Sequence, residues 1–173
     1  MYSGLQMGKR RIVLLVHNVR SAHNVGSMLR TAEGLGVEKI YLTGYSPYPE
    51  SADDERLPHV RQRTDKQISK TALGAEKTLA WQRYSNIATA IKELKNEGFR
   101  IVALEQTSSS KLLQEYKPPE KIGLIVGSEV NGLDTLTLKL VDTSLEIPML
   151  GKKESYNVAV AAGMALYHLR YPC

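Results

Sequence analysis

Residues 11–43 read RIVLLVHNVRSAHNVGSMLRTAEGLGVEKIYLT, and this stretch decides the fold class. Its two ends, Arg11–His17 and Val37–Thr43, are short runs rich in β-branched residues and predict strands. Gly36 offers a C-terminal stop for a helix between them. An apolar stripe recurs at helical spacing within that helix, at Val25, Met28, Leu29, Ala32 and Leu35. The stretch therefore predicts a strand, a helix and a second strand in succession.

The same alternation continues through the rest of the chain. Further strands are predicted at Phe99–Glu105, Lys121–Gly127 and Thr143–Met149, and a further helix at Asn86–Asn96. Strands that alternate with helices are typical of a mostly parallel sheet with helices on its faces. The sequence therefore predicts the α/β class.

The last predicted helix, Tyr156–Tyr171, differs from the others in its pattern. Apolar residues cover nearly its whole circumference, and such a helix has to be buried on more than one side. We expect it to pack on its own sheet and on a partner subunit. Ser155, just before it, is a suitable N-cap residue.

The longest stretch without a regular pattern is Gly44–Gln67, which contains three prolines and carries its acidic and basic residues in two blocks. A loop of this length in a compact domain is more often functional than idle. The basic block extends a little beyond the stretch, and its members are Arg56, Arg61, Arg63, Lys66 and Lys70. These side chains are as compatible with a solvated basic face as with contact to a polyanion.

The overall composition limits the class of protein. At 173 residues, with 42% hydrophobic and 24% charged residues, residues 1–173 are expected to form one globular domain. The net charge of +5 favours a polyanionic partner. The single cysteine, Cys173, cannot form an intramolecular disulfide, and the apolar run Ile12–Val16 is too short for a membrane span. We expect a cytoplasmic protein without a membrane partner.

Several common motifs are missing from the sequence. It contains no G-x-G-x-x-G after the first strand, no G-x-x-x-x-G-K-[ST] loop and no G-x-S-x-G elbow. The four histidines are scattered, and one terminal cysteine does not complete a metal site with them. We therefore expect neither a metal cofactor nor the usual nucleotide-binding and hydrolase sites.

Three segments rich in glycine and polar residues remain, and each follows a predicted strand. They are Asn18–Arg30, Val126–Leu133 and Ile147–Asn157. Open α/β sheets bind ligands beyond the carboxyl ends of their strands, so these segments are the candidate site.

The three segments resemble the motifs of one family. The patterns are N-x-G-x-x-x-R from Asn24 to Arg30, G-x-E-x-x-G-L from Gly127 to Leu133, and I-P-M followed by S-x-N-V-x-V-A from Ile147 to Ala161. In this order and at this spacing they are similar to the SpoU/TrmH-like RNA 2'-O-ribose methyltransferases of the SPOUT superfamily. The resemblance covers about Arg11 to Leu169.

The resemblance implies a SPOUT fold with a deep C-terminal trefoil knot, in which the chain is threaded from about Ile125 onward. It also implies a homodimer that acts on transfer RNA or ribosomal RNA with S-adenosyl-L-methionine as the cofactor. By the same resemblance, the cofactor contacts are expected at Leu104, Gly127, Ile147, Met149, Leu150 and Ser155.

The resemblance also implies catalytic roles. Arg30 is expected beside the target nucleotide, where its forked guanidinium suits a phosphate or a developing alkoxide. Since guanidinium groups stay protonated at neutral pH, we interpret Arg30 as an electrostatic stabiliser and not as the base. The rest of the polar pocket is expected from Asn24, Glu129, Ser155 and Asn157. RNA contacts are expected at Arg30, Arg56, Arg61 and Arg63.

Two other functions remain open at this point. A knotted RNA-binding or ribosome-assembly factor without turnover would have the same fold, and a base methyltransferase of the wider superfamily would have a similar site. Each side chain also has a structural explanation taken alone, because Arg30 could be solvated and Asn24 could cap a helix. The joint spacing of the motifs favours the ribose methyltransferase.

Overall fold

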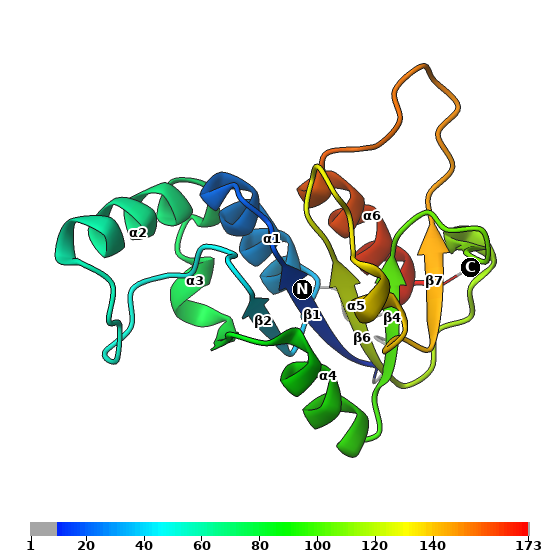
Figure 1. Cartoon of the computed structure of the whole chain (residues 1–173), viewed down its shortest axis with the longest axis horizontal. Coiled ribbons are helices and arrows are strands. Elements are labelled where there is room, and N and C mark those ends of the chain that lie inside the picture. The colour runs from blue at the N-terminus through cyan, green and yellow to red at the C-terminus, as the bar shows by residue number, and fades with distance from the viewer. Residues whose placement is uncertain (1–9, 173) are drawn as a thin grey trace, which may run out of the picture.

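The computed structural model describes residues 10–172, which form one sheet flanked by helices (Figure 1). Every strand pair in this part of the chain is parallel, and the order is β3-β2-β1-β6-β4-β7-β5. The strands are β1 (Arg11–His17), β2 (Lys39–Thr43), β3 (Ala80–Tyr84), β4 (Arg100–Leu104), β5 (Lys111–Leu112), β6 (Lys121–Val126) and β7 (Thr143–Glu146). The predicted α/β class with a parallel sheet is confirmed.

Helices cover both faces of the sheet. One hydrophobic core joins the sheet to α1 (Ala22–Gly34), α2 (Pro58–Ala72), α3 (Ala75–Thr78) and α6 (Val158–Arg170). A second core on the opposite face joins it to α4 (Ile87–Asn96) and α5 (Thr135–Leu138). The short 3-10 helix η1 spans Leu113–Glu115. None of the helices in the described range combines the length and the apolar composition that crossing a membrane requires.

Strand β1, next to the central strand β6, is buried on both faces, which explains its uninterrupted apolar sequence. Leu14 lies level with Ile40 of β2 on one side and with Leu124 of β6 on the other. Because all the strands run the same way, the loops that follow β1, β6, β4 and β7 leave the sheet at the same edge.

Two strands were missed in the sequence and one loop was misjudged. Strands β3 and β5 lie at the edges of the sheet, where side chains are exposed and the apolar pattern is weak. The irregular stretch predicted for Gly44–Gln67 is wrong from Pro58 onward, because Pro58 begins helix α2. A proline is tolerated in the first turn of a helix, where its missing N–H has no partner to lose.

The start of α6 differs from the sequence-based prediction. Its N-cap is Asn157 and not Ser155, since the Asn157 side chain accepts hydrogen bonds from the backbone N–H groups of Ala159 (3.0 Å) and Val160 (3.4 Å). The helix packs on α1, β4 and β6 with one face only. Val160 and Tyr167, on its other side, are 54% and 60% exposed. The strand order is compatible with the expected trefoil knot, which itself stays a prediction.

Candidate functional site

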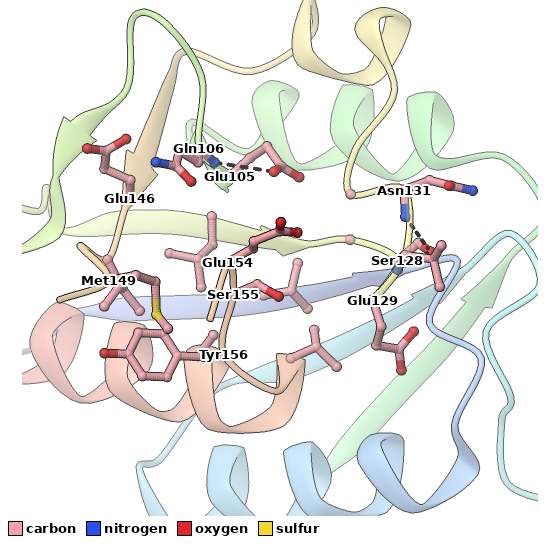
Figure 2. Close-up of a pocket in the computed structure, with 18 of the residues that line it drawn as sticks. Glu105, Gln106, Ser128, Glu129, Asn131, Glu146, Met149, Glu154, Ser155 and Tyr156 are labelled. Carbon is pink, nitrogen blue, oxygen red and sulfur yellow. Dashed lines mark hydrogen bonds between the residues drawn. The ribbon is translucent and has the colours of Figure 1, made fainter. Parts of the chain in front are cut away.

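Three loops meet at the carboxyl edge of the sheet and enclose a cavity of about 420 Å³ (Figure 2). They follow β4, β6 and β7, which are neighbours in the sheet, and α6 closes one side. The apolar part of the lining comes mainly from Leu104, Val126, Leu145, Ile147, Val158 and Ala161. A volume of this size is within the range of small-molecule sites, about 300–1,000 Å³.

Most of the expected cofactor contacts lie on this cavity. Its lining includes Leu104, Gly127, Ile147, Met149 and Ser155. Leu150 does not line it, because its side chain is 97% exposed on the long connection between β7 and α6, which projects away from the sheet (Figure 1). The contacts themselves stay a prediction.

The charge of the lining is one-sided. Four carboxylates surround the cavity, and no lysine, arginine or histidine is among the residues that line it in the described chain. Figure 2 shows these carboxylates, Glu105, Glu129, Glu146 and Glu154, distributed around the opening and not gathered at one point. Such a site favours a cationic ligand over an anionic one.

Glu105 also holds the loop after β6 in place. Its carboxylate accepts a hydrogen bond from the backbone N–H of Leu133 at 2.8 Å. Gly132 has a φ of +62°, and a Cβ there would lie 2.4 Å from Glu105 Oε2. Glycine is therefore favoured at Gly132 by its backbone conformation, and a larger residue there would also displace the Glu105 carboxylate.

A chain of hydrogen bonds joins the three motif segments. Glu129 Oε1 accepts from Asn24 Nδ2 at 2.9 Å, and Asn24 Oδ1 accepts from Asn157 Nδ2 at 3.2 Å. Asn157 is at the same time the N-cap of α6. These hydrogen bonds bring the three distant segments into contact, while the expected roles of their side chains stay predictions. Asn24 and Asn157 lie beside the cavity and are not part of its lining.

The Glu129 carboxylate is held in its ionised form. Partial desolvation raises its pKa, but hydrogen bonds from the Asn24 amide and from backbone N–H groups, including that of Arg20 at 3.2 Å, outweigh this effect. The pKa of Glu129 is therefore below its ordinary value. The geometry gives this side chain an ordering role rather than that of a proton carrier at neutral pH.

His17 closes the end of β1 with a buried network that the sequence did not reveal. Its Nε2 accepts from Asn18 Nδ2 at 3.0 Å, and its Nδ1 lies 2.8 Å from Thr43 Oγ1. Burial lowers the pKa of His17, although the charge of Asp134 acts in the opposite direction. A neutral ring satisfies both contacts, so His17 serves as a fixed link between β1 and β2.

Arg30 does not share this cavity within one chain. It is exposed on α1 and lines a second hollow, between α1 and α2. Six residues separate it from Asn24, which corresponds to a rotation of about 240° around the helix. The two side chains therefore point in different directions, and Arg30 is not among the residues that line the cavity in one chain.

The other arginines expected to contact RNA differ in their surroundings. The Arg56 side chain binds Asp54, with Nε 2.8 Å from Oδ1, and its guanidinium lies 3.7 Å from the centre of the Tyr48 ring. Arg61 Nε lies 3.0 Å from Glu50 Oε1, an ion pair whose angles are not those of a hydrogen bond. Arg63 is exposed on α2.

Three cavity carboxylates were missed as site residues in the sequence. Glu146 ends strand β7, Glu105 directly follows β4, and Glu154 lies in the third segment. Their position at the carboxyl end of a strand was the available indication for Glu105 and Glu146. Among residues 10–172 there is no group of three histidine, cysteine or acidic side chains placed to hold a metal ion.

Known proteins match nearly the whole chain. RlmB of Neisseria meningitidis, a 23S rRNA (guanosine-2'-O-)-methyltransferase, is 31% identical over 159 residues, which are 92% of this chain and 58% of that protein. A crystal structure of a TrmH/SpoU tRNA modifying enzyme from A. aeolicus has a TM-score of 0.76 at 25% identity, covering 95% of this chain and 77% of that one.

A crystal structure of an AdoMet-bound rRNA methyltransferase from Sinorhizobium meliloti has a TM-score of 0.77. The two sequences are 22% identical, and the match covers 92% of this chain and 56% of that one. At this level of identity the comparison shows that the two proteins share a fold. The model of the SpoU rRNA Methylase family matches residues 11–167, a range that contains all three polar segments. The resemblance is confirmed, and this chain belongs to the SpoU rRNA methylase family.

Proposed function

We propose that this protein transfers a methyl group from S-adenosyl-L-methionine to the 2'-hydroxyl of a ribose in transfer RNA or ribosomal RNA. Membership in the family and the 2'-O-methyltransferase activity of the N. meningitidis relative support this function. The observation that carries it is the cavity, which the loops after β4, β6 and β7 build at the carboxyl edge of the sheet and line with four carboxylates.

The charge of the cavity fits the proposed cofactor. When bound, S-adenosyl-L-methionine supplies an electrophilic methyl group on a positively charged sulfur, and the charges of its amino and carboxylate groups cancel, so that the whole molecule is a cation. Carboxylates around an opening without a basic lining residue attract such a ligand. Leu104, Gly127, Ile147, Met149 and Ser155 would hold it.

The reaction would replace the carbon–sulfur bond of the cofactor with a carbon–oxygen bond to the ribose. The hydroxyl would lose its proton to a phosphate oxygen or to solvent. The protein's task is to align the oxygen with that bond and to exclude water. Glu129 and Asn24 fix the loops that bound the site. Arg30 stabilises the charge that develops on the oxygen or on a neighbouring phosphate.

We also propose that the active form is a homodimer. Large apolar side chains are exposed along the loops beside the cavity and along α6, namely Val130, Leu150, Tyr156, Val160 and Tyr167. A second copy of the chain would cover them. The same contact would bring Arg30 of one subunit to the cavity of the other, since the two hollows share no lining residue within one chain.

Mixed dimers test this arrangement. Arg30→Ala removes the guanidinium, and Ser155→Trp fills the cavity from an exposed loop position. If each site combines Arg30 of one subunit with the cavity of the other, equal mixing of the two inactive variants restores about a quarter of wild-type activity, because half of the dimers carry one intact site. No recovery after verified subunit exchange would refute the shared site.

The activity itself is tested by calorimetry and mass spectrometry. We expect S-adenosyl-L-methionine to bind the purified protein, and a ribose-methylated nucleoside to appear in digests of RNA incubated with both. Absence of cofactor binding would support an RNA-binding factor without turnover, and a methyl group on a base would support a base methyltransferase. Either result would overturn the proposal.

A further inference from the structure

The second hollow has the opposite character to the cavity. It lies between α1 and α2 and is lined by Ser27, Arg30, Thr31, Lys70, Thr71 and Leu73. Its lining holds two cations and the hydroxyl groups of Ser27 and Thr31, besides that of Thr71, which already donates within the chain, and no acidic side chain is among its lining residues. Cations and hydroxyl donors are the groups with which proteins hold phosphate oxygens.

Close packing of α2 on α1 places Lys70 beside Arg30. A Cβ at Gly26 would lie 2.2 Å from Thr71 Oγ1 and 2.3 Å from the backbone oxygen of Ile68, so only glycine allows this approach. Thr71 Oγ1 also donates a hydrogen bond of 2.9 Å to the backbone oxygen of His23. The C-terminal half of α2 is thereby fixed against α1, and two like charges line the same hollow.

The basic residues of α2 continue from this hollow along one face. Arg63, Lys66 and Lys70 are spaced by three and four residues, and all are exposed. They lie opposite Ile68 and Ala72, which are the buried residues of the helix. The three positions extend over about 10 Å of the helix. In Figure 1 this helix projects beyond the sheet, on the side away from β7.

The remaining basic residues of this region are already engaged. Arg56 is bound to Asp54 and Arg61 is paired with Glu50, so their charges are compensated within the chain. The exposed face of α2 carries no acidic residue that could compensate its lysines and arginine. Asp65, the acidic residue of this helix, lies on another side, where it accepts a hydrogen bond from the backbone N–H of Glu50. The positive charge of this region is therefore concentrated on the face that leads to Arg30.

We propose that Arg30 and Lys70 form a binding site for a phosphate of the RNA backbone, and that Lys66 and Arg63 bind the phosphates that follow along α2. The inference deepens the proposed function, because it takes RNA as the substrate. It assigns the contact to α2 and to the hollow at its end, rather than to Arg56 and Arg61. The phosphate contact would also fix the target ribose relative to Arg30.

The salt dependence of RNA binding tests this site. The variant Lys66→Ala/Lys70→Ala is compared with the wild type and with Lys92→Ala, which removes an exposed lysine from α4 on the opposite face of the sheet. The probes are unfractionated transfer RNA and deproteinised ribosomal RNA, and binding is measured by fluorescence anisotropy over a range of salt concentrations. Calorimetry with S-adenosyl-L-methionine checks that each variant is folded.

Loss of two phosphate contacts should make the plot of log K against log salt less steep by about 1.4. Binding should become about fifteenfold weaker at 0.15 M salt. We expect this loss for the double variant and none for Lys92→Ala. A wild-type slope in the double variant, or an equal loss in Lys92→Ala, would overturn the inference. If the wild type binds RNA in this way but not S-adenosyl-L-methionine, the proposed activity fails while the phosphate site stands.

Discussion

Replacement of Asn157 separates the two roles of this side chain. Asn157 caps α6 through its Oδ1 and donates through its Nδ2 to Asn24, which in turn binds Glu129. Asn157→Ala removes both contacts. Loss of an N-cap costs about 1 kcal/mol, and a chain of this length loses about 2–4 °C in Tm for each kcal/mol.

Asn86→Ala is the matched control for the cap. Asn86 caps α4 by accepting a hydrogen bond of 2.8 Å from the backbone N–H of Ala88, on the face of the sheet away from the site. We expect the two alanine variants to lose similar stability in thermal unfolding. A hydrogen bond of about 1 kcal/mol that contributes fully to binding corresponds to about a fivefold loss of affinity. Asn157→Ala should therefore weaken the binding of S-adenosyl-L-methionine, and Asn86→Ala should not.

Asn157→Asp distinguishes the cap from the link. A carboxylate keeps the capping oxygen and interacts favourably with the helix N-terminus, but it cannot donate to Asn24. We expect nearly unchanged stability together with weaker cofactor binding, measured by isothermal titration calorimetry. The reasoning is refuted if Asn157→Ala and Asn86→Ala bind the cofactor equally well, since the link would then have no part in shaping the cavity.

Three further predictions concern the loops around the sheet. Gly132→Ala should lower the free energy of unfolding by about 1–3 kcal/mol in urea titrations, because its Cβ meets the Glu105 carboxylate and its φ is positive. Because the pKa of Glu129 is lowered in the folded protein, its carboxylate contributes its full stabilisation above the ordinary pKa of a glutamate. This stabilisation is lost as the pH falls through the lowered pKa, and cofactor affinity, measured by calorimetry, should fall over the same acidic range. The side chain of Arg56 lowers the pKa of Asp54 to about 2, so Arg56→Ala leaves this enclosed carboxylate without its guanidinium partner and should lower Tm. The same variant should leave the salt dependence of RNA binding unchanged.

The order of strands and helices was largely predictable because the central strands are buried on both faces and carry a continuous apolar pattern. Arg11–His17 was predicted with its observed bounds for this reason. The edge strand Ala80–Tyr84 has mostly exposed side chains, so its pattern does not distinguish it from a loop. Pro58 was interpreted as part of a loop, although the same residue is favourable in the first turn of a helix.

The site was predictable only in part. The convergence of Asn24, Glu129 and Asn157 followed from the family motifs, and hydrogen bonds in the structure bear it out. The position of Arg30 did not follow, because the direction of a side chain around a helix depends on where that helix packs. Lys70 acquires its place beside Arg30 only through the contact at Gly26, which no local pattern in the sequence indicates.

Because Asn157 both caps α6 and binds Asn24, the site cannot form before α6 has been synthesised. The last wall of the cavity is made by residues 154–161, so a growing chain has no binding site while α6 is still inside the ribosome. Any ligand taken up afterwards holds α6 onto the rest of the molecule, since it binds only the docked form. Slower amide hydrogen exchange in this helix on addition of cofactor would report that coupling directly.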